Sequence, residues 1–382
     1  MSGRQAAIAG MGLLPFSKNL GRPERTAALE VILQALAEAG IGADDVDGVV
    51  RTTMESTTDA HIAFCLGIPD LRFFGEVGHG GGSGCALVGH AALAVEAGVA
   101  DVVVVYRARN RSTGGRPWAQ AGNQVGGDAQ WSVPFGVVRP VDQIAMLARR
   151  YMHECGITTR HFGEVAVACR SHAAHNPGAQ MRDPITLQDH AAARPVSEPL
   201  RLFDCCLESD GAVAFVVTTL ERARGGTGPP VLIRAHAQGI GPEHVVMTSY
   251  HSENPLQSTA TFAARNLYRH STVGPKDIQC AQLYDAFSPL VLMSLEAYGF
   301  CGPGEGGAFA EDGALQWPDG RLPVNTSGGS LSEAYVHGFN LIAEGVRQVR
   351  GISTAQVAGL EHCLVSSGSG VPTSALILGA DR

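Results

Sequence analysis

Short apolar runs alternate with amphipathic stretches along the first hundred residues of the chain. The run Ala6–Ala9 leads into a glycine turn and is typical of a buried strand, whereas residues 24–40 place apolar side chains at helical spacing before a glycine C-cap. The β-branched run at 101–105 predicts a strand that is buried on both faces. The predicted elements are strands at 6–12, 45–50 and 101–105 and helices at 24–40 and 86–98. Strands that alternate with helices indicate an α/β fold.

The order of elements in the first half recurs in the second half. Residues 222–230 combine charge, glycine and proline, which predicts a link between one half at 1–225 and another at 226–382. The second half is predicted to contain strands at 231–235, 278–283 and 375–379 and helices at 258–268, 288–299 and 339–351. Two similar halves indicate a pseudo-duplicated fold.

One stretch of the first half breaks this rhythm. Between about 107 and 199, glycine, proline, arginine and histidine interrupt the apolar pattern, although helices are predicted at 141–155 and 161–175. We expect this stretch to be an insertion that covers a site.

Composition narrows the class of protein. The 382 residues are 45% hydrophobic and 17% charged, enough to fill one large core or two medium ones. The apolar runs are far shorter than the roughly 20 residues that span a bilayer, and no secretory signal begins the chain, so a soluble, cytoplasmic protein without a membrane partner is expected. The net charge of −8 disfavours nucleic acid as a partner. The nine cysteines include no CxxC pair and are expected to be reduced thiols.

One cluster of metal-ligand residue types lies in the predicted helix at 161–175. Cys169, His172 and His175 are spaced three residues apart. At about 100° per residue they spread over about 120° of the helix surface, too wide for an easy common site. No metal site is therefore predicted.

Several segments of the chain resemble the sterol-carrier (SCP-x) and lipid-transfer-protein branch of the thiolase superfamily. They are GADDVDGVV at 42–50, AALAVEAGVADVVVV at 91–105, YMHECGIT at 151–158, NPGAQMRDPITLQD at 176–189, PLRLFDCCLESDGAVAFVV at 199–217, YDAFSPL at 284–290, VNTSGGSLSEAYVHG at 324–338 and SSGSG at 366–370. The resemblance covers nearly the whole chain. It implies a five-layered αβαβα fold built from two βαβαβαββ halves, and a homodimer that forms through the first half, with the run Val102–Val105 beside the interface.

The resemblance also implies where thiolase chemistry would reside. A thiolase takes the acyl group on a cysteine at a helix N-terminus, where the helix dipole lowers the thiol pKa. Aligning GGGSGCALVGHAAL with that turn places Gly80 at the cysteine position, and glycine cannot carry an acyl group. Cys85 lies five residues further on, where a small buried cysteine is the favoured interpretation.

The other reactive positions of the family are also substituted. The second cysteine of a thiolase aligns with Leu364, and strand alternation points the adjacent Cys363 to the opposite face. The histidine of the Gly-His-Pro motif aligns with Tyr335, and the asparagine of the Asn-Glu-Ala-Phe motif aligns with Tyr284. Both cysteines of the covalent chemistry are therefore missing, and two oxyanion-binding side chains have become phenols.

Two phenols without a nucleophile favour aldol chemistry over acyl transfer. Retro-aldol cleavage of an acyl-CoA needs an acid, a base and a place for the enolate oxygen, and no acyl-enzyme. The combination resembles the steroid side-chain aldolases, which split a β-hydroxy acyl-CoA into a ketone and a shorter acyl-CoA such as propionyl-CoA, and which work with a partner containing an OB-fold and a zinc ribbon. By this resemblance one of Tyr284 and Tyr335 takes the alcohol proton and the other protonates the enolate carbon, while His337 orients a hydroxyl or a carbonyl. The sequence leaves open which tyrosine does which.

The resemblance implies further contacts to the substrate. Coenzyme A is expected only as part of the substrate, with no bound cofactor. The turn residues expected to bind this coenzyme A moiety are Gly329, Ser330, Ser367 and Gly368. Arg107, Arg109, Arg111 and Arg116 form a polar series that either binds the CoA phosphates or is a surface that faces solvent or a partner. Asp285 is interpreted as a structural turn residue that accepts hydrogen bonds from loop amides.

Two other functions remain open at this point. The chain could be a thiolase-like acyltransferase that uses Cys85 as nucleophile, or a non-catalytic subunit that scaffolds a partner. Loss of activity in Cys85→Ala would favour acyl transfer, and activity on any β-hydroxy acyl-CoA would exclude the scaffold.

Overall fold

The first half of the chain forms five strands of one mixed sheet. In this computed structural model, which describes residues 4–114, 126–244, 247 and 252–381, the strands lie in the order β3-β2-β4-β7-β1. The elements are β1 (Ala6–Leu13), α1 (Glu24–Ala39), β2 (Gly48–Thr52), α2 (Asp59–Leu66), β3 (Phe73–Val77), α3 (Gly84–Ala97), β4 (Val102–Asn110), β7 (Asp210–Thr219) and the short α7 (Leu220–Ala223). This half follows the expected βαβαβαββ order.

The second half repeats the order with one strand reduced. Its strands lie in the order β8-β11-β10-β9. The elements are β8 (Val231–Gly239), α8 (Thr259–Arg269), β9 (Cys280–Gln282), α9 (Ser288–Ala297), α10 (Gly306–Ala310), α11 (Gly329–Ser332), α12 (Phe339–Arg350), β10 (His362–Ser367) and β11 (Thr373–Ala380). The strand expected before α12 is shortened to a single parallel bridge between Ala281 and Val324.

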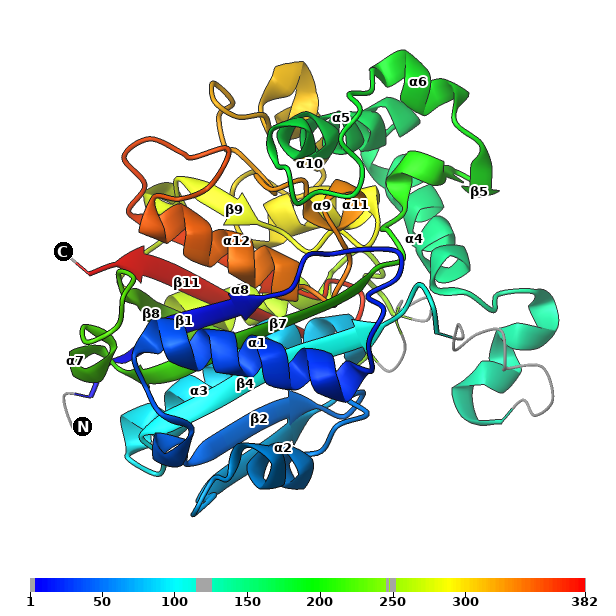
Figure 1. The fold of residues 1–382 in the computed structure, drawn as a ribbon. Helices are drawn as coiled ribbons and strands as arrows, with labels where there is room; N and C mark the ends of the chain where they lie inside the picture. Colours follow the sequence, from blue (N-terminus) through cyan, green and yellow to red (C-terminus); the bar gives the residue numbers. More distant parts are fainter. Residues whose placement is uncertain (1–3, 115–125, 245–246, 248–251, 382) are drawn as a thin grey trace.

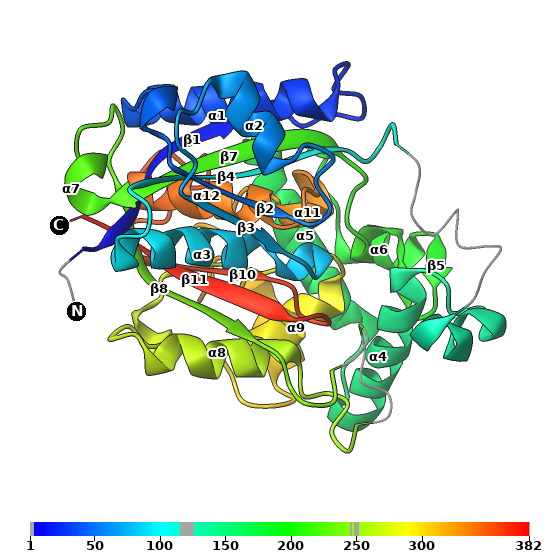
Figure 2. The same ribbon diagram turned by 90° about the horizontal axis from the view of Figure 1, so that it is seen from below.

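The two halves stack into five layers. Helices α1 and α2 cover the outer face of the first half, α8 and α9 cover the outer face of the second, and α3 and α12 lie between the two sets of strands (Figure 2). Antiparallel pairing of Ala7 with Leu232 and of Ile8 with Val231 joins the halves at β1 and β8. The expected αβαβα arrangement is confirmed.

Glycines let α1 approach the sheet closely. A Cβ on Gly10 would lie 2.0 Å from the Ala35 carbonyl oxygen, and one on Gly12 would lie 1.9 Å from the Val31 carbonyl oxygen. Only a residue without a side chain fits under the helix at these two positions. The glycines of the first apolar run therefore serve helix packing.

The insertion stands at one end of the sheet. It contains α4 (Pro140–Cys155), α5 (Thr159–His175), α6 (Leu187–Ala192) and the two-stranded pair β5 (Pro195–Ser197) and β6 (Leu200–Arg201). Figure 1 shows α4 and α6 beyond the strand ends, away from both chain termini. Strand β4 continues to Asn110, so the first residues of the stretch that we expected to be inserted belong to the sheet. The described residues contain no helix that is long and apolar enough to cross a membrane.

The run Val102–Val105 forms the buried strand that its β-branched side chains predict. It is fully buried within β4, which pairs with β2 on one side and β7 on the other. The edge strand of the first half is β3, two strands away from this run. The run thus marks the interior of the sheet, and its place beside a dimer interface stays a prediction.

Candidate active site

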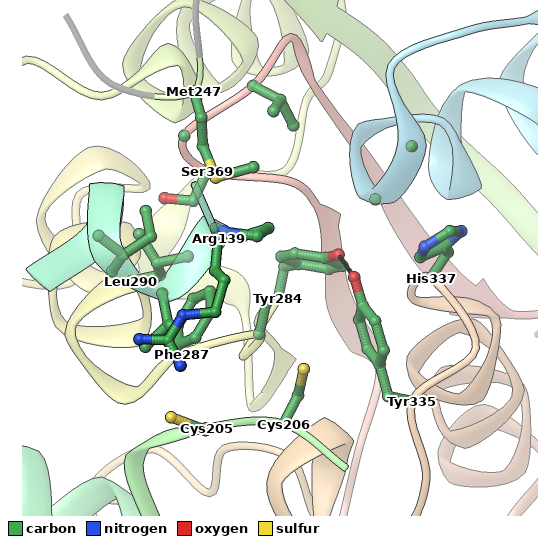
Figure 3. A pocket seen from close by; sticks show the side chains of 18 of the residues that line it. Arg139, Cys205, Cys206, Met247, Tyr284, Phe287, Leu290, Tyr335, His337 and Ser369 are labelled. Carbon is green, nitrogen blue, oxygen red and sulfur yellow. Dashed lines mark hydrogen bonds between the residues drawn. The ribbon is translucent and has the colours of Figure 1, made fainter. Parts of the chain in front are cut away.

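A mostly apolar cavity of about 470 Å³ opens between the insertion and the loops that follow the strands. Its apolar wall includes Val141 and Ile144 of α4 and Leu290 of α9. Polar groups converge on the opposite side, where Tyr284, Tyr335 and His337 line the same cavity (Figure 3). An apolar cavity of this size with a few convergent polar groups is the usual form of a small-molecule site.

The two phenols meet at the wall of this cavity. Their hydroxyl oxygens lie 2.7 Å apart in a buried hydrogen bond, which is the dashed line in Figure 3. Tyr284 follows β9, and its backbone N–H donates to Ser366 Oγ at 3.0 Å. Tyr335 follows α11, and its backbone N–H donates to Ser209 Oγ at 3.1 Å. Both loops are therefore held by hydrogen bonds to buried serines.

Burial keeps both phenols protonated. It raises the pKa of Tyr284 and of Tyr335 well above the ordinary value for tyrosine. Cationic groups oppose this rise: the Arg111 guanidinium lies 5.2 Å from the ring centroid of Tyr335, and Arg107 lowers the pKa of Tyr335 as well. Arg111 is itself paired with Glu208 at 2.9 Å. The two guanidinium groups therefore stabilise negative charge on the Tyr335 oxygen more than purely apolar surroundings would.

The glycine turn before α3 faces the phenols without a side chain. Gly80 and Gly81 line the cavity, and Gly80 has a φ of 51°, which disfavours any residue with a Cβ. A Cβ on Gly81 would lie 1.7 Å from the Tyr284 hydroxyl oxygen. The phenol of Tyr284 therefore occupies the space that a side chain from this turn would need.

The thiols considered for covalent chemistry lie away from the cavity lining. Cys85 is 1% exposed inside α3, and its Sγ donates to the Val365 carbonyl oxygen at 3.5 Å. Burial raises the pKa of this thiol to about 12. Cys363 is fully buried within β10. Neither thiol is placed or ionised as a nucleophile requires.

His337 contacts the arginine series from the other half. Its Nδ1 lies 3.1 Å from Arg107 Nη2, and Arg107 also forms a buried ion pair with Glu55. Arg107 is thus unavailable to a CoA phosphate, contrary to one of our two interpretations, because its two terminal nitrogens, Nη1 and Nη2, contact Glu55 and His337 inside the protein. Arg109 faces Glu24 at 3.5 Å, and Arg116 lies outside the described residues.

The four turn residues expected to bind coenzyme A are not among the residues that line the cavity. Ser330 and Ser367 are fully buried, and Ser367 Oγ accepts the Cys85 backbone N–H at 3.0 Å. A Cβ on Gly329 would clash with Asp285, and one on Gly368 would lie 2.8 Å from Gly82 Cα. These residues hold the loops together, and the cavity lining gives no support to their predicted contact with substrate.

Asp285 acts as the structural residue that the sequence suggested. It is fully buried next to Tyr284 and accepts the backbone N–H groups of Ser330 at 2.8 Å and of Leu331 at 3.2 Å. The carboxylate thus holds the first turn of α11, which leads to Tyr335. The interpretation as a turn residue is confirmed by this geometry.

The cysteine and the two histidines of α5 contact residues of the second half. Cys169 Sγ lies 3.8 Å from Asp285 Oδ2, whereas His172 contacts the Asn325 carbonyl oxygen at 3.2 Å and accepts the Trp317 backbone N–H at 2.8 Å. His175 packs edge-on against the Trp317 ring. These contacts serve packing between α5 and the second half.

Sequence reasoning missed several residues of the cavity. Cys205, Cys206 and Arg139 also line the cavity, and all three are labelled in Figure 3. Cys205 and Cys206 lie in one of the segments that resemble the family, but nothing in their spacing indicates that they face a site. Gly81 could have been found from the run of glycines before α3, since glycine is typical where a backbone approaches another group closely.

Comparisons with known proteins agree with this geometry. The model for "Thiolase C-terminal domain-like" proteins matches residues 241–379. The chain is 50% identical over 98% of its length, and 99% of the relative, to a 17-hydroxy-3-oxo-4-pregnene-20-carboxyl-CoA lyase of Mycobacterium tuberculosis. It is also 50% identical over 99% of its length, and 98% of the relative, to a steroid side-chain-cleaving aldolase of Thermomonospora curvata.

Solved structures give the same result. An Ltp2-ChsH2(DUF35) aldolase superposes with a TM-score of 0.94 at 49% identity, covering 99% of this chain and 98% of that one. The fold and the paired phenols define a thiolase-fold protein without the thiolase nucleophile. The chain belongs to the family of steroid side-chain-cleaving aldolases within the thiolase superfamily. The expected family and the expected lyase class are confirmed.

Proposed function

We propose that the protein cleaves a β-hydroxy acyl-CoA of a steroid side chain by retro-aldol chemistry. The products are a ketone and a short acyl-CoA such as propionyl-CoA. The observation that carries the proposal is the 2.7 Å hydrogen bond between the two phenols at the wall of an apolar cavity. The name of the M. tuberculosis relative, a lyase for a hydroxylated steroid carboxyl-CoA, supports the substrate class.

The phenol pair moves protons without accumulating charge. Tyr335 accepts the proton of the tertiary alcohol and at the same time passes its own proton to Tyr284 along the 2.7 Å hydrogen bond, because both phenols start protonated. Arg107 and Arg111 stabilise the negative charge that develops on the Tyr335 oxygen during this transfer. The alcohol oxygen becomes the ketone as the bond between the α and β carbons breaks, and the electron pair of that bond forms the enolate of the acyl-CoA. Tyr284 in turn passes its proton to the enolate carbon, so neither phenol gains or loses a proton overall. The pair therefore ends each cycle as it began.

The apolar wall suits the ring system of such a substrate. Val141, Ile144 and Leu290 line the same cavity as the phenols, and its volume of about 470 Å³ is within the usual range of ligand sites. We propose that coenzyme A enters only as part of the substrate. The buried thiol of Cys85 supports no acyl-enzyme, so no observation favours an acyltransferase.

The direct test is product analysis with a hydroxylated steroid side-chain CoA thioester. We expect equimolar ketone and propionyl-CoA from the wild-type chain, and a fall in kcat of roughly 30- to 1000-fold in Tyr335→Phe with KM nearly unchanged. Tyr268→Phe is the matched control, because that hydroxyl donates to the Tyr298 carbonyl oxygen at 2.9 Å, apart from the cavity lining. Absence of ketone under all conditions, or equal loss in both variants, would exclude the proposal.

We further propose a partner protein with an OB-fold and a zinc ribbon. The similar solved structure is named as a complex with a DUF35 component. Large apolar side chains stand exposed on the insertion of this chain: Trp131 is 75%, Phe135 79% and Met146 47% exposed. We expect Phe135→Asp to weaken co-purification of the partner, while Leu33→Asp, at 50% exposure on α1, leaves it unchanged.

A homodimer through the first half is the last part of the proposal. The end strand β3 exposes 65% of Phe74, and neighbouring α2 exposes 86% of Phe64. An edge strand with exposed apolar side chains can pair with a second copy of the chain.

A further inference from the structure

A chain of three buried side chains ends at the wall of the cavity. The Glu55 and Arg107 side chains, each 1% exposed, form an ion pair, and Arg107 Nη2 lies 3.1 Å from His337 Nδ1. Glu55 follows β2, Arg107 lies on β4, and His337 follows α11, so the contact joins the two halves inside the protein. A buried ion pair is costly to maintain unless its contacts are well satisfied, so the contact between Arg107 and His337 is part of what this pair serves.

The contact with Arg107 fixes the tautomer of His337. A guanidinium offers only N–H donors, so Nδ1 of the imidazole must accept the hydrogen bond. Burial, with the charges of Arg107, Arg111 and Arg109, lowers the pKa of His337 well below its ordinary value. The ring is therefore neutral at physiological pH, and its hydrogen is on Nε2.

The Nε2 hydrogen is available to a ligand. His337 lines the cavity beside Tyr335, with ring centroids 5.3 Å apart (Figure 3). Within the described part of the chain, Nε2 has no hydrogen-bond partner. The backbone of His337 has a φ of 50°, a conformation that residues other than glycine adopt rarely and mainly where the surroundings enforce it.

We infer that His337 donates this hydrogen bond to the thioester oxygen of the substrate, and that Arg107 and Glu55 are positioning residues that hold it in the donating tautomer. The inference rests on the proposed retro-aldol function. When the bond between the α and β carbons breaks, its electron pair forms the carbon–carbon double bond of the enolate and the carbonyl pair moves onto the thioester oxygen. His337 keeps its proton throughout and stabilises that oxygen as a fixed donor.

Exchange of the α-hydrogens of propionyl-CoA in D₂O tests the donor without any carbon–carbon cleavage. Exchange needs the same enolate, formed in the reverse sense. We expect His337→Asn to slow it by about 100- to 1000-fold, the usual effect of removing one oxyanion donor. Asparagine tolerates a positive φ better than most residues, so the loop is retained. Exchange at the wild-type rate in this variant, or none in the wild-type protein, would overturn the inference.

The positioning role is tested with the ion pair removed as a unit. The double variant Glu55→Leu/Arg107→Met leaves no orphan charge, and Arg350→Met removes an arginine side chain that is also 1% exposed but is bound to Glu38. Imidazole ¹⁵N spectra, with the His337→Asn spectrum for assignment, should show hydrogen on Nε2 in the wild type and in Arg350→Met. In the double variant the Nδ1-bound tautomer should appear, and the exchange rate should fall at least 10-fold with KM within about twofold.

These outcomes separate the inference from the proposed function. Exchange that depends on His337 in a chain that cleaves no hydroxylated acyl-CoA would exclude the retro-aldol proposal and leave the donor role standing. Normal cleavage in His337→Asn would exclude the donor role alone. A wild-type ring with hydrogen on Nδ1 would exclude the positioning role of Arg107.

Discussion

The hydroxyl oxygen of Tyr284 lies 1.7 Å from the point that a Cβ on Gly81 would occupy. No such contact is tolerated, so a methyl group at position 81 must displace the phenol and break its bond to Tyr335. We expect Gly81→Ala to lower kcat by about 10- to 100-fold while the protein remains folded. Steady-state kinetics and a thermal melt check this.

Gly78→Ala is the control for this prediction. It lies three residues earlier, where the nearest atom to a Cβ is Thr53 Oγ1 at 3.9 Å. A kcat equal to wild type in both variants would mean that the contact does not position the phenol.

The two phenols should behave as one unit on mutation. Tyr284→Phe and Tyr335→Phe each remove one end of the 2.7 Å hydrogen bond, and each should cost about 2–4 kcal/mol of transition-state stabilisation. Once one hydroxyl is gone, the other has no relay partner. The kcat of the double variant should therefore lie within about threefold of the kcat of the slower single variant. Additive losses in a double-mutant cycle of kcat would show that the hydroxyls act separately.

The Cys85 thiol should be dispensable for turnover. It is buried in α3, and its pKa is raised to about 12, so Cys85→Ala is expected to change kcat by less than about twofold. The variant should lose about 1 kcal/mol of folding free energy because a small buried side chain is truncated. Urea unfolding and product release measure the two effects. A collapse of activity with normal stability would favour the acyltransferase alternative.

Asp285 should make stability fall as pH rises between about 4 and 6. Burial raises its pKa from 3.8 to about 6, so in this range the folded protein binds a proton that the unfolded chain has released. The stabilising contribution is complete below the unfolded pKa and is lost as pH rises through the folded pKa. Free energies of unfolding should therefore drop over this window in the wild type relative to Asp285→Asn, with a constant difference above it. A difference that does not vary with pH would contradict the prediction.

The exposed ring of Phe74 should control association. Light scattering is expected to give twice the chain mass of 39.9 kDa for the wild type and the single mass for Phe74→Asp, because a charge on the end strand prevents pairing. Leu33→Asp, on the outer helix α1, is the matched control. A monomeric wild type at micromolar concentration would contradict the proposed dimer.

The periodicity of the sequence predicted which segments form helices and strands better than it predicted where each strand lies in the sheet. The helix at 24–40 and the C-cap at Gly40 agree with α1, because apolar spacing and a left-handed glycine are local signals. Strand β3 was not predicted, since the two adjacent phenylalanines and the glycine of Phe73–Val77 give no alternation of apolar and polar residues. The run Val102–Val105 was correctly predicted as a buried strand, but its hydrophobicity indicates burial and not its position within the sheet.

The site residues that lie within family motifs could be predicted from the sequence. Tyr284, Tyr335 and His337 converge on one cavity as the resemblance implied. The roles of Ser330 and Ser367 could not be derived in this way, because a turn residue on the inner side of a loop and one on the outer side have the same local sequence signal. The link from Arg107 to His337 spans 230 positions, and no pattern of local spacing indicates such a contact.

The close fit of Gly81 and Tyr284 also constrains the order in which such a site arises. A larger residue at position 81 and a tyrosine at position 284 exclude each other sterically, so a chain with this backbone can hold only one of them. A side chain introduced at position 81 therefore requires loss of the phenol first. The residues at positions 81 and 284 are thus coupled, and the effect of a substitution at either one depends on which residue occupies the other.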